Sequence, residues 1–485
     1  MSPAEIRELI LRIDNEPGIL DYELSNGLSI WLIFRHDLYY YFLGKSVEGS
    51  ANQLNTNISR TKRIQKKILL TARYALRSYL KNPFKIKQQY EVLNFCTTAG
   101  SYLSGDCYRS RMSGFLSDIP GIKTLNVFHS HNRSFHKKYC GDYCFADFFL
   151  LKEEFRNKLS FGKRDNADCP AIDLFFNHIR KFTIDVLSGK DIAAFRDSLT
   201  IWNNYSRGYE KSVRRFLKNV KPRLLVIEDG NYGNWLVGII IKVAREMQLP
   251  TAEIQHGVFD VAFQYGEKLL NNKDFSKYKT DYVFTFGPYF TDYIRSTSTN
   301  LSLGNYFLET RKKQQDVTNP QNGRLKLLFI SQQHLTNPII PVLYEMLKKS
   351  DKSLELIVRL HPAELNNIDR YKCLEELENV FFSFKDDIYK LIAEANFVIG
   401  LYSTVLFEVV YFDKSPLIYK NDFSDEFIPE ELGFRFSNST ELLNLISNQN
   451  NIETKAKAMK AYFWTSGCVE NFSEFLAQKG FNKTI

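Results

Sequence analysis

The sequence contains no apolar run of about 18 residues, the length that a helix needs to cross a lipid bilayer. Its N-terminal segment, MSPAEIRELILRIDNEPGI, places acids and bases among its apolar positions, and it lacks the uninterrupted apolar stretch of a signal peptide. We therefore expect a cytoplasmic protein, one that can also lie peripherally on the inner face of the cell membrane.

Cysteine is scarce, with seven residues in a chain of 485. An odd number of scattered cysteines in a chain without an export signal is typical of free thiols. Five soft side chains gather in one segment, but their spacing fits no zinc-finger pattern. We expect no metal there and interpret the segment as a loop over the acceptor site. Its side chains are His129, His131, His136, Cys140 and Cys144.

Acidic residues are missing between Arg60 and Lys87, where basic residues alternate with apolar residues at helical spacing. This pattern predicts a basic amphipathic helix over 60–82 that ends near Pro83. Two interpretations stay open. The helix can adsorb to anionic lipid, at about 1 kcal/mol per basic residue near the surface, or it can be the solvated face of a domain helix. Because no nucleic-acid motif accompanies the charge, we expect no nucleic-acid partner.

The length of the chain exceeds what one hydrophobic core supports, so we expect two or more domains. Strand-like apolar runs alternate with helical segments, which predicts parallel sheets in an α/β fold. A polar, turn-rich segment at 309–324 is interpreted as a linker between domains 1–308 and 325–485, with a last helix that can return to the N-terminal domain. The predicted strands cover 28–34, 91–96, 124–128, 224–227, 251–255, 282–286, 325–330, 354–360, 397–399 and 415–419.

Polar clusters follow several of these strands. In open α/β sheets, ligands bind beyond the carboxyl ends of the strands, so two such sheets would bring the clusters into one cleft. Glu228 and Asp229 close an apolar strand, where partial desolvation and mutual repulsion would raise the pKa of one carboxyl group. Such a group suits a general base that removes a proton from an acceptor hydroxyl. The alternative is that the acids cap the next helix.

The second cluster is Arg359-Leu-His361-Pro362. A histidine at a strand end, followed by a proline that cannot extend the sheet, can donate a hydrogen bond to a phosphate oxygen. Arg359 can approach a bound nucleotide. The alternative for His361 is a structural histidine with satisfied hydrogen bonds.

The third cluster is Ser403-Thr404, which precedes a predicted helix. Two hydroxyls beside the free amides of a first helical turn can hold a phosphate, and a simple helix cap is the alternative. The same two interpretations apply to Ser331 and Gln332, which precede the helix near Pro338.

Taken together, the three clusters resemble the signature motifs of bacterial sialyltransferases: an acidic pair with glycine, a His-Pro and a Ser/Thr pair. The resemblance implies the GT-B fold, in which two Rossmann-like domains face a central cleft, with a CMP-activated sugar acid as donor and no metal. It implies that Asp229 is the general base and that His361 assists the departing phosphate.

The same resemblance implies three further contacts with the donor. Ser403 and Thr404 would bind its phosphate, and Arg359 would lie near the cytosine. Asp386 or Asp387 would hold the ribose.

The chain also resembles a wider group of capsule and teichoic-acid transferases. The shared features are Gln255-His256-Gly257 after a strand, Phe286-Gly287-Pro288, and Tyr402-Ser403-Thr404 with Glu408 one turn later. In the members that transfer polyol phosphates, the histidine of a similar His-Gly turn is the base. His256 is therefore a rival to Asp229.

The resulting hypothesis is an inverting, metal-independent glycosyltransferase that needs no cofactor besides its nucleotide-sugar donor. It would move a CMP-activated nonulosonic acid onto a surface glycan or lipid-linked glycan. One alternative keeps the fold but uses a UDP-sugar, a GDP-sugar or a CDP-polyol. A second alternative is a non-catalytic scaffold on the membrane face of polysaccharide assembly, which would use residues 60–87 to bind anionic lipid.

Overall fold

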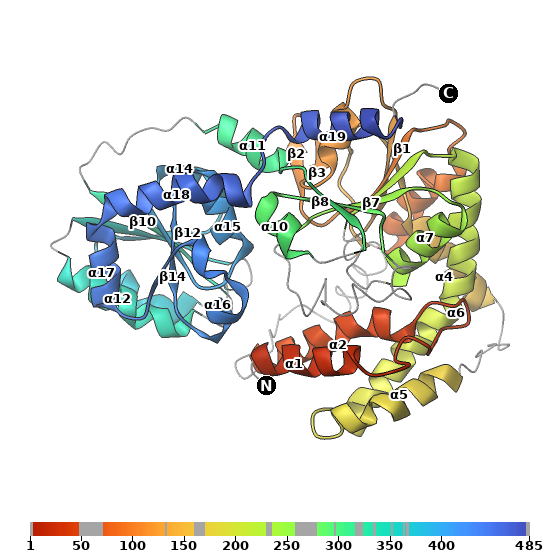
Figure 1. Cartoon of the computed structure of the whole chain (residues 1–485), viewed down its shortest axis with the longest axis horizontal. Coiled ribbons are helices and arrows are strands. Elements are labelled where there is room, and N and C mark those ends of the chain that lie inside the picture. Colours follow the sequence, from red (N-terminus) through yellow and green to blue (C-terminus); the bar gives the residue numbers. More distant parts are fainter. Residues whose placement is uncertain are drawn as a thin grey trace.

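The computed structural model describes residues 3–47, 71–130, 133–159, 170–228, 235–257, 279–294, 297–315, 324–332, 336–350, 353–361, 364 and 368–481. Two α/β domains lie side by side, and the first and last parts of the chain both belong to the larger, N-terminal domain (Figure 1).

A seven-stranded sheet forms the centre of the N-terminal domain, in the order β5-β4-β1-β6-β7-β8-β9. Every pair along it is parallel. The central strand β6 is buried at all of its positions, as expected for a parallel strand that is covered on both faces. The strands are β1 (Val92–Thr97), β4 (Thr124–His129), β5 (Asp142–Phe145), β6 (Leu224–Glu228), β7 (Thr251–Ile254), β8 (Tyr282–Thr285) and β9 (Thr299–Ser302).

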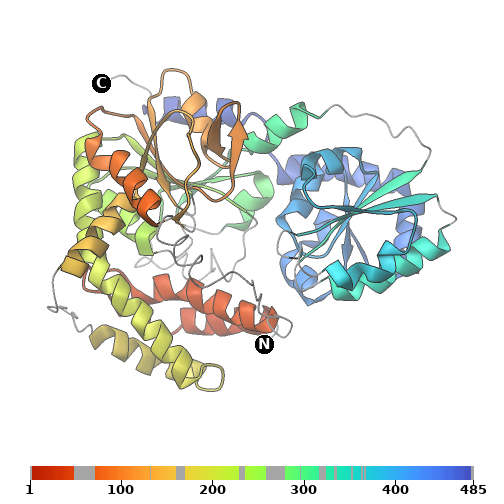
Figure 2. The same cartoon turned by 180° about the vertical axis from the view of Figure 1, so that it is seen from behind.

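Successive residues of β6 point to opposite faces of this sheet. Leu225 and Ile227 pack with the core beneath α4 (Asp147–Leu159), α6 (Gly189–Val220) and α7 (Trp235–Glu246). Leu224 and Val226 pack on the other face with α19 (Cys468–Gln478). The last helix of the chain therefore covers the N-terminal sheet (Figure 2).

A helical lobe begins the chain. It consists of α1 (Pro3–Asp14) and α2 (Ile30–Val47), with α5 (Pro170–Thr183) beside them. The prediction of a strand over 28–34 is wrong, because α2 begins inside that segment. Trp31 and Phe34 contact Phe175 of α5, and α2 is apolar over most of its circumference. A helix buried in this way has no helical periodicity in its sequence and resembles a buried strand.

The C-terminal domain is built on a six-stranded parallel sheet in the order β12-β11-β10-β13-β14-β15. Helices surround it, and two such α/β domains side by side give the predicted GT-B fold (Figure 1). Its strands are β10 (Leu325–Ile330), β11 (Leu354–Arg359), β12 (Val380–Ser383), β13 (Phe397–Gly400), β14 (Pro416–Tyr419) and β15 (Phe434–Phe436). Its longer helices are α12 (Ile340–Lys349), α14 (Ile388–Glu394), α15 (Thr404–Tyr411), α17 (Ser439–Ser447) and α18 (Gln449–Phe463).

Two segments connect the domains. Helix α11 (Tyr306–Lys313) occupies the first part of the segment expected as a linker at 309–324, and residues 316–323 lie outside the described residues. Near the end of the chain, Trp464 stacks on Phe286 of the N-terminal domain at 5.0 Å between ring centroids. Thr465 N also donates to Phe286 O at 2.7 Å. This crossing places α19 on the N-terminal domain.

The basic segment is described from residue 71 onward, where 71–80 form a helix. The 3-10 turn Pro83–Lys85 follows that helix, at the predicted end. Residues 60–70 of the expected helix lie outside the described residues. Among the helices that the structure describes, none is long and apolar enough to cross a bilayer.

The expectation that all cysteines are free is wrong for two of them, since Cys107 and Cys140 form a disulfide. A β-bridge between Tyr108 and Tyr139 aligns their two segments and brings the cysteine Cα atoms to 5.2 Å. Such pairing across 33 residues of sequence has no local signal. The described cysteines that stay free are Cys96, Cys144, Cys373 and Cys468.

One buried ion pair anchors the N-terminal lobe. The Asp14 carboxylate accepts hydrogen bonds from Arg35 at 2.7 and 2.8 Å and from Trp31 Nε1 at 2.9 Å. We predict that Asp14→Ala lowers the free energy of unfolding of this lobe by about 3–5 kcal/mol, because it leaves a buried guanidinium unpaired. Thermal unfolding measures the loss. An equal effect of Asp21→Ala, at an exposed acid nearby, would contradict this explanation.

Candidate functional site

Parallel topology brings several predicted residues to one edge of each sheet. Strands β6 and β7 are neighbours, so Glu228 at the end of β6 lies near His256, which follows the end of β7 in the N-terminal domain. In the C-terminal domain β11, β10 and β13 are adjacent, and they place His361, Ser331 and Ser403 along the same edge. Asp229 and Pro362 lie outside the described residues, so their predicted roles stay predictions.

Both oxygens of the Glu228 carboxylate bind groups of the N-terminal domain. Oε2 accepts from Thr97 N at 3.0 Å, and Oε1 accepts from Ser113 Oγ at 2.5 Å and from Ser110 Oγ. The side chain is buried. Glu228 therefore ties the end of β1 to the end of the hairpin β2–β3 (Ser101–Ser104 and Cys107–Ser110) and to Ser113 beyond it. Its predicted part in catalysis stays a prediction.

The turn after β7 is held from within by Gln255, which is fully buried. Its Nε2 donates to Gly257 O and its Oε1 accepts from Phe286 N, each at 2.7 Å. The amide thus links the ends of β7 and β8, and it fixes the backbone on both sides of the half-buried His256.

A buried carboxylate organises the corresponding turns of the C-terminal domain. Glu364 accepts from Ser331 Oγ, from Tyr371 OH at 3.1 Å and from Arg370 Nη1 at 3.1 Å. Ser331 Oγ in turn accepts from His361 N at 2.8 Å. Ser331 is buried, and its hydroxyl supports the backbone of His361. Its predicted contact with a donor stays a prediction.

The backbone of Gln332 also forms hydrogen bonds within its own domain. Its N–H donates to Thr336 Oγ1 at 2.9 Å, and its carbonyl accepts from the same hydroxyl at 2.7 Å. The backbone of the residue holds the turn after β10.

Ser403 caps α15, since its hydroxyl accepts from Val405 N at 3.2 Å. The neighbouring Thr404 is exposed. Capping and phosphate binding are compatible, because the cap leaves the other amides of the first turn pointing along the helix axis.

The two candidate ribose ligands have different surroundings. Asp387 caps α14 and pairs with Arg311 Nη1 at 3.1 Å. Asp386 is exposed and accepts from Ser383 Oγ at 2.7 Å, while Arg359 Nη1 donates to Ser383 O at 3.3 Å. Asp386 and Arg359 therefore share the end of β12. The contact of Asp386 or Asp387 with a ribose stays a prediction.

The two domains meet at the predicted turns. A Cβ atom built on Gly257 would lie 3.7 Å from Thr404 Cγ2, an ordinary van der Waals contact. The His256–Gly257 turn of the N-terminal domain therefore lies against the Ser403–Thr404 turn of the C-terminal domain. This contact places the candidate base of one domain beside the candidate phosphate site of the other.

Three residues that position this region were not predicted from the sequence. Arg111 and Tyr389 form a contact between the domains with Glu408, and Glu364 organises the His361 turn. Glu364 could have been found as an acid three residues after the His-Pro histidine. Arg111 has no local signal, because its two partners lie 278 and 297 residues away in the sequence. The same separation hides its partner Tyr389.

The segment with the histidines and cysteines is part of the fold. Cys140 is in the disulfide, Cys144 is buried in β5, and the His136 ring stacks on Tyr108 at 3.8 Å. Among the described residues, no three His, Cys, Asp or Glu side chains form a group suited to a metal ion, and His131 lies outside them.

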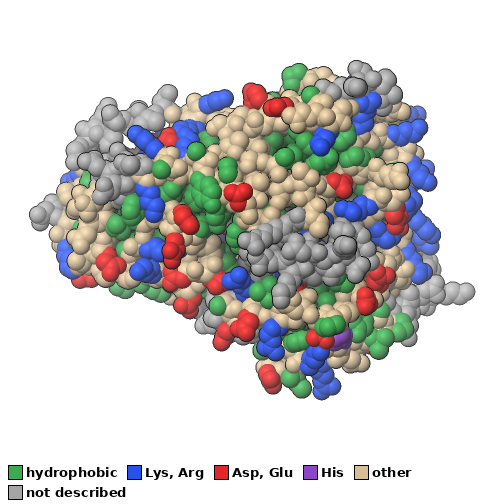
Figure 3. All heavy atoms as spheres, viewed as in Figure 1, with side chains coloured by type: hydrophobic (Ala, Val, Ile, Leu, Met, Phe, Trp, Pro, Cys, Tyr) green, Lys and Arg blue, Asp and Glu red, His purple; other side chains and the backbone are tan. Residues whose placement is uncertain are grey.

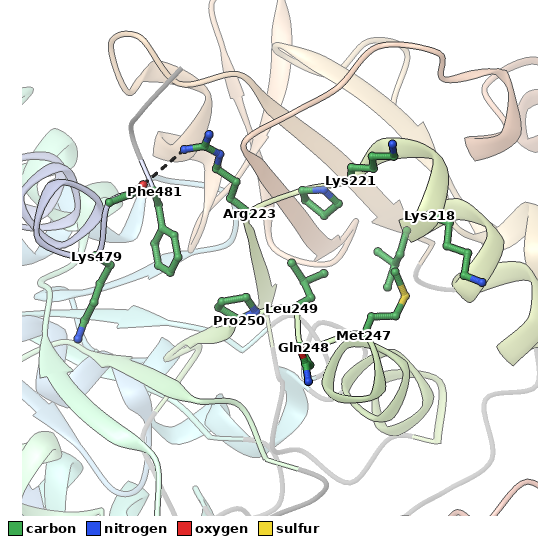
Figure 4. A pocket seen from close by; sticks show the side chains of 12 residues that line it. Lys218, Lys221, Arg223, Met247, Gln248, Leu249, Pro250, Lys479 and Phe481 are labelled. Atoms are coloured by element: carbon green, nitrogen blue, oxygen red, sulfur yellow. Dashed lines mark hydrogen bonds between the residues drawn. The ribbon is translucent and has the colours of Figure 1, made fainter. Parts of the chain in front are cut away.

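A surface groove of about 610 Å³ lies at the opposite edge of the N-terminal sheet, where β6 and β7 begin. Figure 4 shows an apolar centre with Leu249 and Pro250, and the amines of Lys218, Lys221 and Lys479 directed outward around it. The groove is separate from the turns described above, which follow the carboxyl ends of the strands.

A family model described as CDP-Glycerol:Poly(glycerophosphate) glycerophosphotransferase matches residues 322–463. The matched segment runs from the start of the C-terminal domain to the end of α18 and contains His361, Ser403 and Glu408. No curated protein sequence matches the chain. The C-terminal domain is thus similar to a family of transferases.

Several solved structures are similar to most of the chain. A glycotransferase of kitacinnamycin has a TM-score of 0.49 at 9% identity, over 81% of this chain and 99% of its own. A putative UDP-N-acetylglucosamine 2-epimerase from Listeria monocytogenes has 0.48 at 10%, over 82% and 98%. The lipopolysaccharide outer core galactosyltransferase WaaB has 0.46 at 12%, over 80% and 99%. At such identities the likeness concerns the fold alone.

The contact between the two turns predicts a cross-link. We expect the double variant Gly257→Cys, Thr404→Cys to form a disulfide on mild oxidation, because the two side chains would lie within the range that a disulfide spans. Mobility on a non-reducing gel, with each single variant as control, measures its formation. Failure of the oxidised double variant to cross-link would show that the two turns do not meet in solution.

Proposed function

We propose that this protein is a transferase that takes a polyol phosphate from a CDP-linked donor and attaches it to a hydroxyl of a surface polymer. The observation that carries the proposal is the contact of the His256–Gly257 turn with the Ser403–Thr404 turn. The family match over the C-terminal domain supports a CDP-linked donor, and it favours this reaction over transfer of a CMP-activated sugar acid.

The reaction has a definite balance. The acceptor oxygen attacks the phosphorus that carries the polyol, and a phosphodiester bond forms. The bond between this phosphorus and the oxygen of CMP breaks, and CMP leaves with the bonding electrons. The acceptor proton passes to a base of the N-terminal domain, for which we propose His256 because its turn faces the C-terminal half of the site.

The C-terminal domain would stabilise the charge on the phosphates. Free amides of the first turn of α15 and the Thr404 hydroxyl can donate hydrogen bonds to phosphate oxygens. His361 stands on the same sheet edge and can donate to the departing nucleotide. In such a reaction most of the catalytic effect comes from fixed donors and alignment.

A CMP-activated sugar acid remains the second candidate donor. It shares the cytidine nucleotide, and Asp229 would then be the base in place of His256. The motifs Glu228-Asp229, His361 and Ser403-Thr404 favour it, whereas the His256–Gly257 turn favours the CDP-polyol. UDP- and GDP-sugars lack the cytosine that Arg359 is proposed to approach.

A donor screen tests the proposal. The protein is incubated with CDP-glycerol, CMP-sialic acid, UDP-N-acetylglucosamine or a GDP-sugar, and release of the nucleotide is followed with and without a poly(glycerophosphate) acceptor. We predict acceptor-dependent release of CMP from CDP-glycerol, lowered by about 100- to 10,000-fold in His256→Ala, because general bases contribute that much to the rate.

His36→Ala, at a histidine of α2 in the N-terminal lobe, is the matched control and should keep the wild-type rate. Retained activity of His256→Ala together with loss in Asp229→Asn would move the base to the acid. Release of CMP from CMP-sialic acid and not from CDP-glycerol would replace the proposed donor.

We further propose that the helix over 71–80 faces an anionic lipid surface. Leu76, Tyr79 and Leu80 are 56–57% exposed on this helix, and Phe155 of α4 is 64% exposed. Tyr79 contacts Phe148, which precedes Phe155 by two helical turns on the same face of α4. The exposed side chains thus form one apolar surface on two neighbouring helices.

Basic side chains border this apolar surface. Arg73, Lys81, Lys85 and Lys87 are exposed, and Lys85 Nζ lies 4.8 Å above the Tyr79 ring. Figure 3 shows further Lys and Arg side chains gathered along the margin of the N-terminal domain at the right of the view, on the side where α6 lies. Apolar side chains ringed by cations fit the headgroup region of an anionic bilayer.

Vesicle sedimentation tests this surface. We predict binding to vesicles that contain phosphatidylglycerol and none to pure phosphatidylcholine, with a loss of about tenfold or more in the triple variant Leu76→Ser, Tyr79→Ser, Leu80→Ser, since buried apolar area and charge act together. The control is Leu174→Ser with Ile184→Ser, at residues 57% and 58% exposed elsewhere. Equal loss in both variants would contradict a specific lipid-facing surface.

A further inference from the structure

Helix α15 receives a second contact from the N-terminal domain, one turn beyond the Ser403–Thr404 turn. Arg111 follows the hairpin β2–β3 and reaches into the C-terminal domain, where its Nη2 lies 3.3 Å from Glu408 Oε1 and donates to Tyr389 OH. Tyr389 OH donates to Glu408 Oε2 at 2.8 Å. One guanidinium from the first domain thus binds two side chains of the second.

The position of Glu408 on α15 shows which face of the helix this contact holds. Thr404 and Glu408 are four residues apart on α15, so they lie on the same face of the helix. That face meets the N-terminal domain at both points, with Thr404 against Gly257 and Glu408 against Arg111. A third contact packs Phe407 of α15 against Phe290 of α10 (Pro288–Tyr293), with 5.8 Å between the ring centroids. Of the three, the contact of Arg111 with Glu408 is the ion pair that orients α15 relative to the N-terminal domain.

Aromatic rings line the half-buried side chain of Arg111. The guanidinium carbon lies 4.6 Å from the Phe307 ring centroid and 6.0 Å from that of Tyr389. Glu408 is buried, and burial raises the pKa of its carboxyl group while Arg111 opposes that rise. A carboxylate in such a place needs its cation, so loss of Arg111 disturbs α15 more than loss of an exposed ion pair would.

The backbone at Arg111 is also tied to the turns of the N-terminal domain. The preceding Ser110 donates to Glu228, and its Oγ accepts from Met112 N at 3.1 Å. Glu228 ends β6, immediately before Asp229. A continuous set of contacts therefore runs from the end of β6 through Ser110 and Arg111 to Glu408 and α15.

We propose that Arg111 is a positioning residue that holds α15, and with it the Ser403–Thr404 turn, in register with the turns of the N-terminal domain. The role in transfer rests on the proposed function, whereas the positioning rests on the contacts alone. Arg111 touches neither donor nor acceptor in this account. It aligns the half-site that holds the phosphate with the half-site that holds the base.

The first test needs no substrate. The variant Arg111→Ala is made in the Gly257→Cys, Thr404→Cys background, and the rate of disulfide formation on mild oxidation is compared with that of the parent. We expect a severalfold slower reaction, because α15 is no longer held against the N-terminal domain. Arg109→Ala, on the same hairpin but bonded to Gly114 and Asp118 of its own domain, should leave the rate unchanged.

The second test separates binding from turnover. Arg111→Ala should bind CMP as the wild type does, measured by titration calorimetry, because the nucleotide site belongs to the C-terminal domain. Its kcat with CDP-glycerol should fall by about 100-fold, the loss that a shift of about 1 Å between reacting groups causes. Arg111→Lys keeps the charge but loses the planar fork, so we expect an intermediate kcat.

These outcomes distinguish the two proposals. If no nucleotide-activated donor is turned over but Arg111→Ala slows the cross-link, the positioning role stands and the proposed function fails. An unchanged cross-linking rate in a folded Arg111→Ala variant overturns the positioning role, and so does a weakened CMP affinity with unchanged kcat. If Arg111→Ala does not fold, the same comparison is made with Arg111→Lys, and an unchanged rate there overturns the inference.

Discussion

The placement of the two domains' turns relative to each other depends on one helix, α15, which meets the N-terminal domain through Thr404 at its first turn and through Glu408 one turn later. The partners in the N-terminal domain are Gly257, which follows β7, and Arg111, which follows the β2–β3 hairpin. Both contact the same face of α15. In parallel sheets, residues that bind ligands lie beyond the carboxyl ends of the strands. Helix α15 begins at that edge of the C-terminal sheet, so its first turns contact the corresponding edge of the N-terminal sheet. These contacts determine how the proposed base on the N-terminal domain lies relative to the proposed phosphate site on the C-terminal domain.

Buried carboxylates hold the turns of both domains. Glu228 binds the ends of β1 and the β2–β3 hairpin, and Glu364 binds Ser331, which supports His361. Gln255 serves the same purpose for the His256 turn with an uncharged amide. Polar groups this deeply buried stabilise a single arrangement only when all of their hydrogen bonds are made, so they preorganise the neighbouring residues that can reach a substrate.

Much of the scaffold was accessible from the sequence, because buried parallel strands are short, continuous apolar runs. The strands at 224–227 and 325–330 agree with β6 and β10 within a residue. The strand predicted over 28–34 was wrong, because α2 is apolar over most of its circumference and its sequence lacks helical periodicity. Contacts between distant segments could not be predicted from the sequence, because neither partner has a local pattern that indicates the other. The Cys107–Cys140 disulfide and the Arg111–Glu408 pair are two such contacts.

We propose that the turns of both domains form one donor site, and hydrogen–deuterium exchange on addition of CDP-glycerol measures whether they do. We predict slower exchange in residues 251–257 of the N-terminal domain and in residues 400–408 of the C-terminal domain at the same donor concentration. Slower exchange in only one of these segments, or around the groove lined by Lys218 and Lys479 instead, would contradict a shared site.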